Sequence, residues 1–491
     1  MLFRRQPRST VTSNPAGAGI YAELARWIPP ERLVLDHSEL KVYECDGLPL
    51  HKELPGAVAL CASRQEVIAV VRWCNEKNVP FVPRGAGTGL SGGATPTARA
   101  VVLDLNRMNR VLHVDLQNRY AVVEPGVINI KLTHEVHADG FHYAPDPSSQ
   151  KACTIGGNVA ENAGGPHCLK YGMTTDHILG LEVVLPDGET ARLSGPLAEN
   201  SGYDLAGLFV GTEGTFGIVT EITVRLVPNP ESIRTFLAIF PRMNLACRTV
   251  AEITRQGILP AALEILDQLT IRAVEASVFK AGYPQDAAAV LLIEIDGLDA
   301  GMDEEEQKIR QIAKENEAIE FRTARDETER LKLWKGRKGA FGAMGRVNTD
   351  LYVLDGVVPR TRLENVLNEV YEIAKRHGVT LANVFHAGDG NLHPNISYDG
   401  RDPDERSRVL LAGREILEAC VRAGGSISGE HGIGLEKMDF MPLCFTEEDL
   451  QLQKDLRRAV DPRNLSNPAK IFPDSKSCVE VGKRHATLVP L

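Results

Sequence analysis

The sequence lacks the features of a nucleic-acid-binding, membrane-spanning or iron–sulfur protein. Its net charge is −10, and it has no basic block that could neutralise phosphates, so nucleic acid is not an expected partner. No apolar run approaches the roughly 18 residues of a transmembrane helix. The nine cysteines form no CxxC pair, which argues against an iron–sulfur cluster held by this chain and is typical of reduced thiols in a cytosolic or matrix compartment.

The first 20 residues lack acidic side chains and carry Arg4, Arg5 and Arg8. They also lack the apolar stretch of a secretory signal, so secretion is not expected. Two alternatives stay open for this segment, a mitochondrial presequence and a disordered tail.

A chain of 491 residues is too long for one hydrophobic core, so two or three domains are expected. Pro228 and Pro230 mark a plausible boundary. Beyond it, strands at 235–240 and 289–296 and helices at 246–256 and 303–316 fit a ferredoxin-like β-α-β-β-α-β order. We expect five segments: an N-terminal segment (1–50), a first domain (51–230), a second domain (231–440), a helical return to the first domain (441–475) and a tail (476–491).

A helix is expected from Ser63, which forms a capping box with Glu66 ahead of an apolar stripe. The chain then enters a glycine-rich loop, Arg84-Gly85-Ala86-Gly87-Thr88-Gly89-Leu90-Ser91-Gly92-Gly93. A Rossmann loop must open a helix, but residues 91–96 cannot propagate one. The loop is therefore predicted to meander, with outward backbone N–H groups that suit pyrophosphate oxygens. A glycine-rich turn without a ligand is the alternative.

Two further glycine-rich segments favour a ligand. One covers residues 154–165, and the other covers residues 211–219. Three separate loops that allow close backbone approach suit a long dinucleotide lying extended across a domain.

Histidines form a second constellation. His386 and His393 flank Gly388-Asp389-Gly390-Asn391, which carries hairpin signals, so a turn is expected to bring both imidazoles to one end. Glu430 and His431 lie between two glycines further along. Two imidazoles and one carboxylate are a common set of ligands for a divalent metal. The alternative is that the histidines only stabilise a tight turn.

Together these motifs resemble the vanillyl-alcohol-oxidase/p-cresol-methylhydroxylase flavoprotein superfamily. Within it the chain is similar to the branch of glycolate oxidase catalytic subunits and FAD-linked D-lactate dehydrogenases, from about residue 50 to 473. The resemblance implies an α+β fold, with an FAD-binding domain of the p-cresol-methylhydroxylase type followed by a ferredoxin-like FAD-linked oxidase C-terminal domain.

The resemblance also implies which residues bind FAD. The first loop is expected to bind the pyrophosphate, through Arg84, Gly85, Ala86, Gly87, Thr88, Gly89, Leu90 and Gly92. The second glycine-rich segment is expected to contact the isoalloxazine and the ribityl chain, through Thr154, Gly157, Asn158, Ala160, Asn162 and Gly164. The remaining expected contacts are Pro145, Asp146, Ile218, Val219, Glu430 and Asn467. Some relatives attach FAD through a His close behind the Arg-Gly pair of the first loop. This chain has none there, so the FAD is expected to be non-covalent.

For the chemistry, the resemblance implies that His386, His393 and Glu430 bind a divalent metal, Zn or Mn. His431 is then the base, Asn395 contacts the substrate, and Arg337 binds the substrate carboxylate. A solvated basic helix face is the alternative for Arg337. Relatives acting on D-2-hydroxyglutarate carry a Lys in the strand that here covers residues 351–355, which has no cation. A small substrate, glycolate or D-lactate, is therefore favoured.

The expected reaction is oxidation of a D-2-hydroxy acid to the 2-oxo acid by hydride transfer to flavin N5. His431 would take the hydroxyl proton. An external electron acceptor is expected, together with iron–sulfur and second flavin-domain subunits as in glycolate oxidase systems. We expect a cytoplasmic location, peripheral at the inner membrane, or a mitochondrial one in a eukaryote. The alternatives are a D-2-hydroxyglutarate-type dehydrogenase, another FAD enzyme of the superfamily, such as an alkyl-dihydroxyacetonephosphate synthase-like or aryl-alcohol oxidase, and a non-catalytic flavin-binding subunit.

Overall fold

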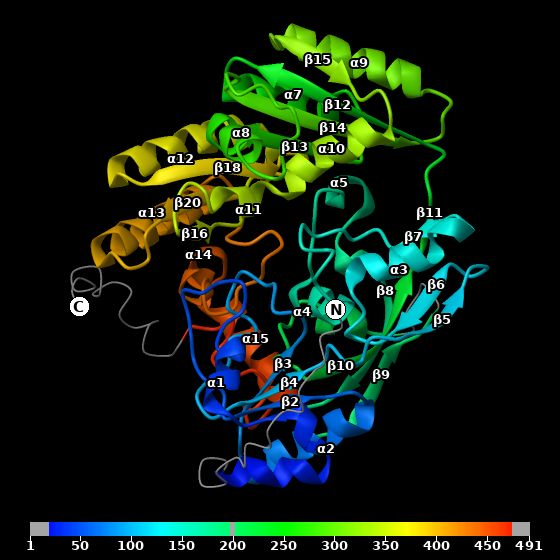
Figure 1. Ribbon diagram of the computed structural model, residues 1–491, viewed down its shortest axis with the longest axis vertical. Coiled ribbons are helices and arrows are strands. Elements are labelled where there is room, and N and C mark those ends of the chain that lie inside the picture. Colours follow the sequence, from blue (N-terminus) through cyan, green and yellow to red (C-terminus); the bar gives the residue numbers. More distant parts are fainter. Residues whose placement is uncertain (1–18, 197–201, 474–491) are drawn as a thin grey trace, which may run out of the picture.

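The computed structural model describes residues 19–196 and 202–473 (Figure 1). The presequence or tail expected at residues 1–18 and the tail from 476 lie outside the described residues. Figure 1 shows two halves: a lower one that contains the N-terminal strands, and an upper one built on a large sheet. Among the described residues, no helix combines the length and apolarity needed to cross a membrane.

The lower half contains two main sheets. The first has the order β1-β2-β4-β3, with bounds Leu33–Val34, Ala57–Leu60, Val101–Asp104 and Phe81–Arg84. The second has the order β5-β6-β10-β8-β9, with bounds Val111–Asp115, Tyr120–Val123, Ile218–Arg225, Ile178–Val184 and Thr190–Ser194. Helix α2 (Arg64–Lys77) starts as predicted, with Ser63 accepting a hydrogen bond from the Glu66 N–H. The second half of the expected capping box is wrong, because the Glu66 carboxylate accepts from the Ala62 N–H and from Arg32 instead.

The first glycine-rich loop opens no helix, which confirms that it is not a Rossmann loop. It leaves β3 at Arg84 and runs irregularly until β4. The second segment differs from the expected loop, because residues Ile155–Glu161 form helix α4. Thr154 supplies the reason: its hydroxyl caps the Gly157 N–H and starts a helix in spite of two glycines.

The upper half confirms the ferredoxin-like order. Strands β12 (Ser232–Phe240), β13 (Ala262–Asp267), β14 (Ala289–Gly297) and β15 (Glu320–Thr323) pair antiparallel in the order β15-β12-β14-β13. Further strands extend this sheet beyond β13: β18 (Thr380–His386), β19 (Asn391–Leu392) and β17 (Gly356–Val357). Beside them, β16 (Asp350–Val353) pairs with β20 (Pro394–Tyr398).

Helices cover both faces of the upper sheet, which explains why its strands are apolar on both sides. Side chains at even positions of β12, such as Phe236, pack with α7 (Met243–Arg255), α9 (Met302–Glu315), α12 (Leu363–His377) and α13 (Pro403–Arg422). Those at odd positions, such as Leu237, pack with α8 (Gln268–Glu275), α10 (Glu327–Lys338) and α11 (Ala340–Met344). Helix α10 lies toward the lower half (Figure 1).

The C-terminal segment runs from the upper half back to the first glycine-rich loop. Helix α15 (Glu447–Val460) starts at Thr446 with the capping box Thr446–Asp449. Beyond it, Ser466 forms a parallel bridge with Phe81 of β3. The Asn467 side chain donates to the carbonyls of Gly93 and Glu213 at 2.8 and 2.6 Å. Residues near the end of the described chain therefore fix loops that lie far earlier in the sequence.

Candidate active site

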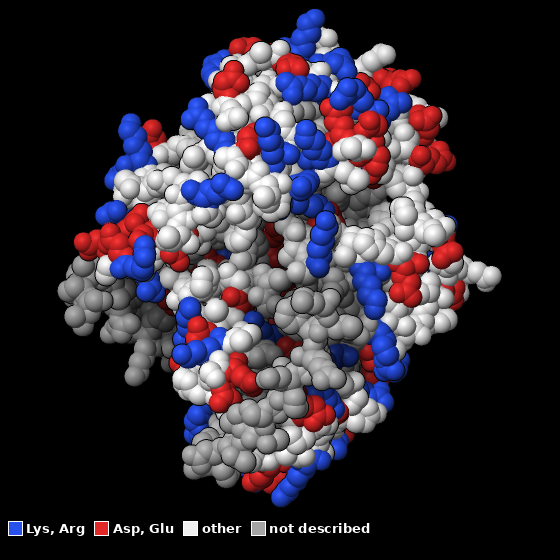
Figure 2. Space-filling view, in the orientation of Figure 1, with Lys and Arg blue, Asp and Glu red and all other residues white. Residues whose placement is uncertain are grey.

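A cavity of about 1190 Å³ lies between the two halves. Figure 2 shows a hollow at their junction, with Lys and Arg side chains gathered above it. Segments of the lower half line one side of the cavity, and α10, α11, His393, Glu430 and His431 line the other, whereas His386 does not line it. The volume is above the range of roughly 300–1,000 Å³ that is usual for ligand pockets, which suits a large cofactor with a small substrate beside it.

Glycines bring the first loop close to its neighbours. A Cβ on Gly85 would lie 2.3 Å from the Thr154 hydroxyl oxygen, and one on Gly87, whose φ is +69°, would lie 2.2 Å from the Arg84 guanidinium. Arg84 itself donates to the Cys45 carbonyl at 2.8 Å, so it braces the loop. This close-packed backbone cradle fits an extended dinucleotide such as FAD.

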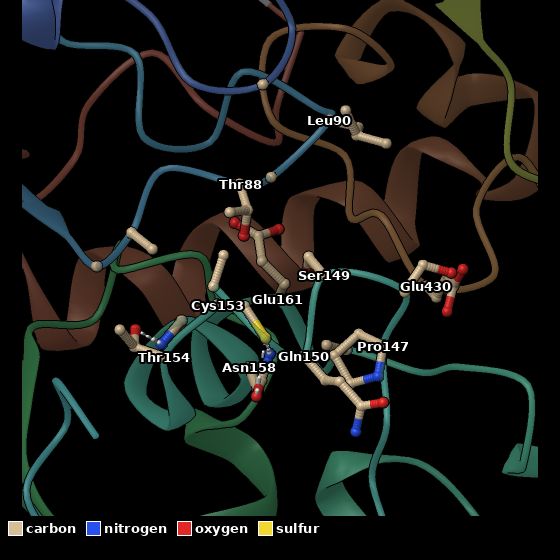
Figure 3. A pocket seen from close by; sticks show the side chains of 18 of the residues that line it. Thr88, Leu90, Pro147, Ser149, Gln150, Cys153, Thr154, Asn158, Glu161 and Glu430 are labelled. Atoms are coloured by element: carbon tan, nitrogen blue, oxygen red, sulfur yellow. Dashed lines mark hydrogen bonds between the residues drawn. The ribbon is translucent and has the colours of Figure 1, made fainter. Parts of the chain in front are cut away.

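Most of the predicted cofactor residues line the cavity. They are Arg84, Gly85, Ala86, Gly87, Thr88, Gly89, Leu90, Thr154, Gly157, Asn158, Ala160, Gly164, Ile218, Val219 and Glu430. Figure 3 shows Thr88, Thr154, Asn158 and Glu430 around one space. Five others do not line it: Gly92, Pro145, Asp146, Asn162 and Asn467. Asp146 is instead paired with His167 and Lys338 at 2.8 and 2.9 Å.

Sequence reasoning missed several lining residues. Ser149, Gln150 and Cys153 precede α4 and contribute one wall, and Glu161 ends that helix (Figure 3). The signal for Glu161 was present, since it stands inside the second glycine-rich segment.

The predicted hairpin brings the two histidines together. His386 ends β18 and pairs with Asn391 of β19, so the chain reverses across residues 387–390. The ring centroids of His386 and His393 are 5.1 Å apart. The Glu430 Oε1 atom lies 3.2 Å from His386 Nε2 and 3.1 Å from His393 Nε2. The three side chains thus present ligand atoms to one point.

The far sides of both imidazoles are held by acceptors. His386 Nδ1 lies 2.8 Å from a Glu264 oxygen, and His393 Nδ1 lies 3.2 Å from the Leu354 carbonyl. This leaves the Nε2 lone pairs facing Glu430, the usual arrangement of metal-binding histidines. Burial opposes protonation of His386, but Glu264 and Glu430 raise its pKa well above the ordinary value. The site therefore favours a positive charge at Nε2, which a proton or a metal ion would supply, so the donor set fits a divalent cation.

His431 stacks on His393, with ring centroids 5.0 Å apart and planes 7° apart. Burial lowers the pKa of His431 to about 4, so its imidazole is neutral at physiological pH and has a lone pair for a proton. The buried Nδ1 has no hydrogen-bond partner among the described residues. Asn395 also lines the cavity and donates to the His393 carbonyl at 2.7 Å.

Arg337 is buried, with 4% of its surface exposed, so the alternative of a solvated basic helix face is wrong. Its guanidinium pairs with Glu264 at 2.5 Å and approaches His386 Nδ1 at 3.3 Å. Arg337 lines the cavity, as do three other cations of its own helix, Arg330, Lys335 and Lys338. Val353 of β16 lines the cavity too. It belongs to the segment that lacks the Lys expected in relatives acting on D-2-hydroxyglutarate.

Two buried carboxylates near the histidines were not predicted, Glu264 and Asp355. Asp355 lies between β16 and β17 and accepts hydrogen bonds from residues 429–431, the start of a segment that we call the ligand loop (residues 429–434). Burial disfavours its charged form, but neighbouring positive groups, Lys437 among them, keep the pKa of Asp355 below its ordinary value. Neither carboxylate stands in a motif, and each reaches the site only through the fold.

Known families match both halves of the chain. Residues 55–194 match the FAD binding domain family, and residues 229–471 match the family of C-terminal domains of FAD-linked oxidases. The glycolate oxidase subunit GlcD of Escherichia coli K12 is 43% identical over 462 residues, which cover 94% of this chain and 92% of that protein. A D-lactate dehydrogenase of Archaeoglobus fulgidus is 34% identical, over 84% of this chain and 90% of that protein.

Solved structures share the fold. p-Cresol methylhydroxylase with bound substrate superposes with a TM-score of 0.78 at 18% identity, over 93% of this chain and 96% of that one. The 4-ethylphenol oxidase of Gulosibacter chungangensis gives 0.77 at 22% identity, over 96% and 99%. The predicted fold class, with a p-cresol-methylhydroxylase-like domain followed by an FAD-linked oxidase C-terminal domain, is confirmed.

Proposed function

The chain belongs to the FAD-linked oxidase family, alongside glycolate oxidase subunits and D-lactate dehydrogenases, and on that basis we propose that it oxidises glycolate or D-lactate to the 2-oxo acid. It is an FAD-dependent oxidoreductase of small hydroxy acids. The observation that carries the substrate class is that the cofactor loops face Arg337, His393 and His431 across one cavity.

Each residue of the cavity has its own proposed role in the reaction. Bound FAD supplies the acceptor for the substrate hydride. Arg337, buried and cationic, binds the substrate carboxylate. Asn395 orients the substrate, and the neutral His431 takes the hydroxyl proton.

His386, His393 and Glu430 are the proposed metal ligands, for Zn or Mn. A divalent cation there would lower the pKa of a hydroxyl group bound to it. The donor set supports this proposal, because its three ligand atoms lie within 4.8 Å of one another and both imidazoles are oriented from behind. Exhaustive chelation should lower turnover, and added Zn²⁺ or Mn²⁺ should restore it. Full turnover in protein shown by elemental analysis to be metal-free would rule the metal out.

The substrate proposal is tested by anaerobic mixing with glycolate, D-lactate, L-lactate and D-2-hydroxyglutarate while flavin bleaching is followed. Bleaching by glycolate or D-lactate, with L-lactate inert, is the expected result. Fast bleaching by D-2-hydroxyglutarate alone would favour the dicarboxylate alternative, for which Lys335 of the cavity wall offers a cation. Failure of every acid to bleach bound flavin would favour the non-catalytic subunit.

Three finer points belong to the same proposal. FAD is bound non-covalently, so acid-precipitated protein should release all its flavin into the supernatant. Electrons leave to an external acceptor, and the working form includes iron–sulfur and second flavin-domain subunits, a proposal supported by the subunit name of the GlcD relative. The location is cytoplasmic, at the face of the inner membrane, or mitochondrial in a eukaryote.

A further inference from the structure

The ligand loop is held by two buried carboxylates that come from opposite halves of the molecule. Asp355 belongs to the upper half and follows β16. Glu213 belongs to the lower half and lies in the third glycine-rich segment, before β10. Both are buried, with exposed fractions of 0% and 4%. The loop between them contributes Glu430 and His431.

Asp355 binds the first part of the loop. Its carboxylate accepts from three consecutive backbone N–H groups, those of Gly429 at 3.1 Å, Glu430 at 3.2 Å and His431 at 2.8 Å. The Asn391 amide and the Lys437 ammonium donate to the same carboxylate at 2.8 and 3.2 Å. Consecutive N–H groups converging on one anion form a nest, which fixes the backbone of all three residues.

Glu213 binds the next part of the loop. Its two oxygens accept from the Ile433 and Gly434 N–H groups at 2.7 and 2.8 Å. Glycine is required at position 432, between the N–H groups bound by Asp355 and those bound by Glu213. A Cβ on Gly432 would lie 3.0 Å from Glu213 Oε1 and 2.4 Å from Glu161 Oε2. Glu213 also lines the cofactor cavity.

The loop has no hydrogen-bonded ladder of its own, because residues 429–434 belong to no helix or strand. Five of its six backbone N–H groups donate to Asp355 or Glu213. A buried N–H that loses its acceptor costs about 1–3 kcal/mol, so the loop geometry depends on both carboxylates.

We propose that Asp355 and Glu213 are positioning residues that together set the place of Glu430 and His431. Glu213 also ties the metal site to the cofactor loops. The inference rests on the proposed roles of Glu430 as a metal ligand and His431 as a base. It predicts that metal affinity depends on two carboxylates outside the proposed ligand set of His386, His393 and Glu430.

The test measures Zn²⁺ affinity of the FAD-loaded protein by competition with a chelator. Asp355→Asn and Glu213→Gln keep the size of each side chain but replace one acceptor oxygen with a donor. Each should weaken Zn²⁺ binding about 10- to 100-fold, the usual effect of removing a partner that orients metal ligands.

Asp267→Asn is the matched control. Asp267 is also buried, and it accepts the N–H groups of Thr270 and Asn383 at 2.9 and 2.7 Å, away from the ligand loop. It should lower the melting temperature without changing Zn²⁺ affinity. This separates positioning from a general loss of stability.

The outcomes are distinct. If the unaltered protein binds Zn²⁺ and both variants bind it as tightly, the positioning role is overturned while the proposed function stands. If the unaltered protein binds neither Zn²⁺ nor Mn²⁺, the proposed metal site fails and the inference fails with it. Should Asp355→Asn give no folded protein, Glu213→Gln decides by the same measurement.

Discussion

At the scale of single residues, His431 differs from its neighbours in having no carboxylate partner for its ring nitrogens at hydrogen-bond distance. Glu430, the nearest, is 3.9 Å from Nε2. His386, by contrast, is engaged on both ring nitrogens. This difference separates a group free to accept a proton from one held as a ligand.

Replacing His431 with Ala should therefore abolish flavin bleaching by substrate while FAD stays bound. A general base contributes about 10²- to 10⁴-fold, so the loss should be in that range or larger. The measurement is the anaerobic bleaching rate, with the flavin-to-protein ratio and Zn²⁺ content checked beside it. A near-normal rate in a folded, loaded variant would show that another group takes the proton.

The residues of the site were predictable to the extent that they stand in motifs. His386 and His393 flank a glycine-containing turn, and Glu430 and His431 lie between two glycines, so their grouping followed from local pattern. Glu264 and Asp355 were not predictable, because they join the site through strands whose pairing depends on the whole sheet. Arg337 was ambiguous, because helix α10 is rich in charge and its sequence does not show which charges are buried.

At the scale of elements, the β18–β19 turn is what makes two histidines seven residues apart into neighbours. Gly390 carries the reversal: its φ is +81°, and a Cβ there would lie 2.1 Å from the Val358 carbonyl oxygen. The backbone of Val358 is tied to the turn, because its N–H donates to the Gly390 carbonyl. The Val358 carbonyl therefore cannot move away from an added Cβ without breaking that hydrogen bond.

Gly390→Ala should therefore destabilise the protein and weaken Zn²⁺ binding together. Left-handed backbone alone costs a non-glycine residue roughly 1–2 kcal/mol, and the clash adds to this. Gly378→Ala is the control, since Gly378 has a φ of +63° with nothing within 4 Å of the added Cβ. Denaturant unfolding and chelator competition check both. Equal stability losses and unchanged Zn²⁺ affinity would contradict the role given to the turn.

The elements show the same division between local and distant causes. Helix α15 and the hairpin were predictable from Thr446 and from the Asp-Gly and Gly-Asn pairs. Helix α4 was not, because Gly156 and Gly157 lower helix propensity. Close packing requires the first of these glycines, since a Cβ on Gly156 would lie 2.5 Å from the Pro125 side chain.

At the scale of the whole molecule, ion pairs join the two halves beside the cavity. His167 and Asp146 of the lower half meet Lys338 and Glu294 of the upper half. Burial opposes protonation of His167, but Asp146 and Glu294 raise its pKa to about 10. The imidazolium is thus present at neutral pH and pairs with Glu294 of β14, while Lys338 of α10, the helix that carries Arg337, pairs with Asp146.

A histidine with a raised pKa in the folded state stabilises the protein fully below its unfolded pKa, near 6.5. That contribution is lost as the pH rises toward about 10. The free energy of unfolding should therefore decline between pH 7 and 10, and His167→Gln should flatten this decline. At pH 7 the variant should lose roughly 3 kcal/mol, as when one partner of a buried pair is removed. Urea unfolding across this pH range checks both statements, and an equally steep decline in the variant would exclude His167 as its source.

The bridge between Ser466 and Phe81, with the amide of Asn467 on the carbonyls of Gly93 and Glu213, also bears on the order of events during synthesis. A ribosome makes the first glycine-rich loop early, but the contacts that fix it come from residues translated nearly 400 positions later. The cofactor compartment is consequently completed only when translation is almost finished. We therefore expect flavin to load after translation of this segment, and a premature stop before residue 466 would leave the FAD-binding loops without that support.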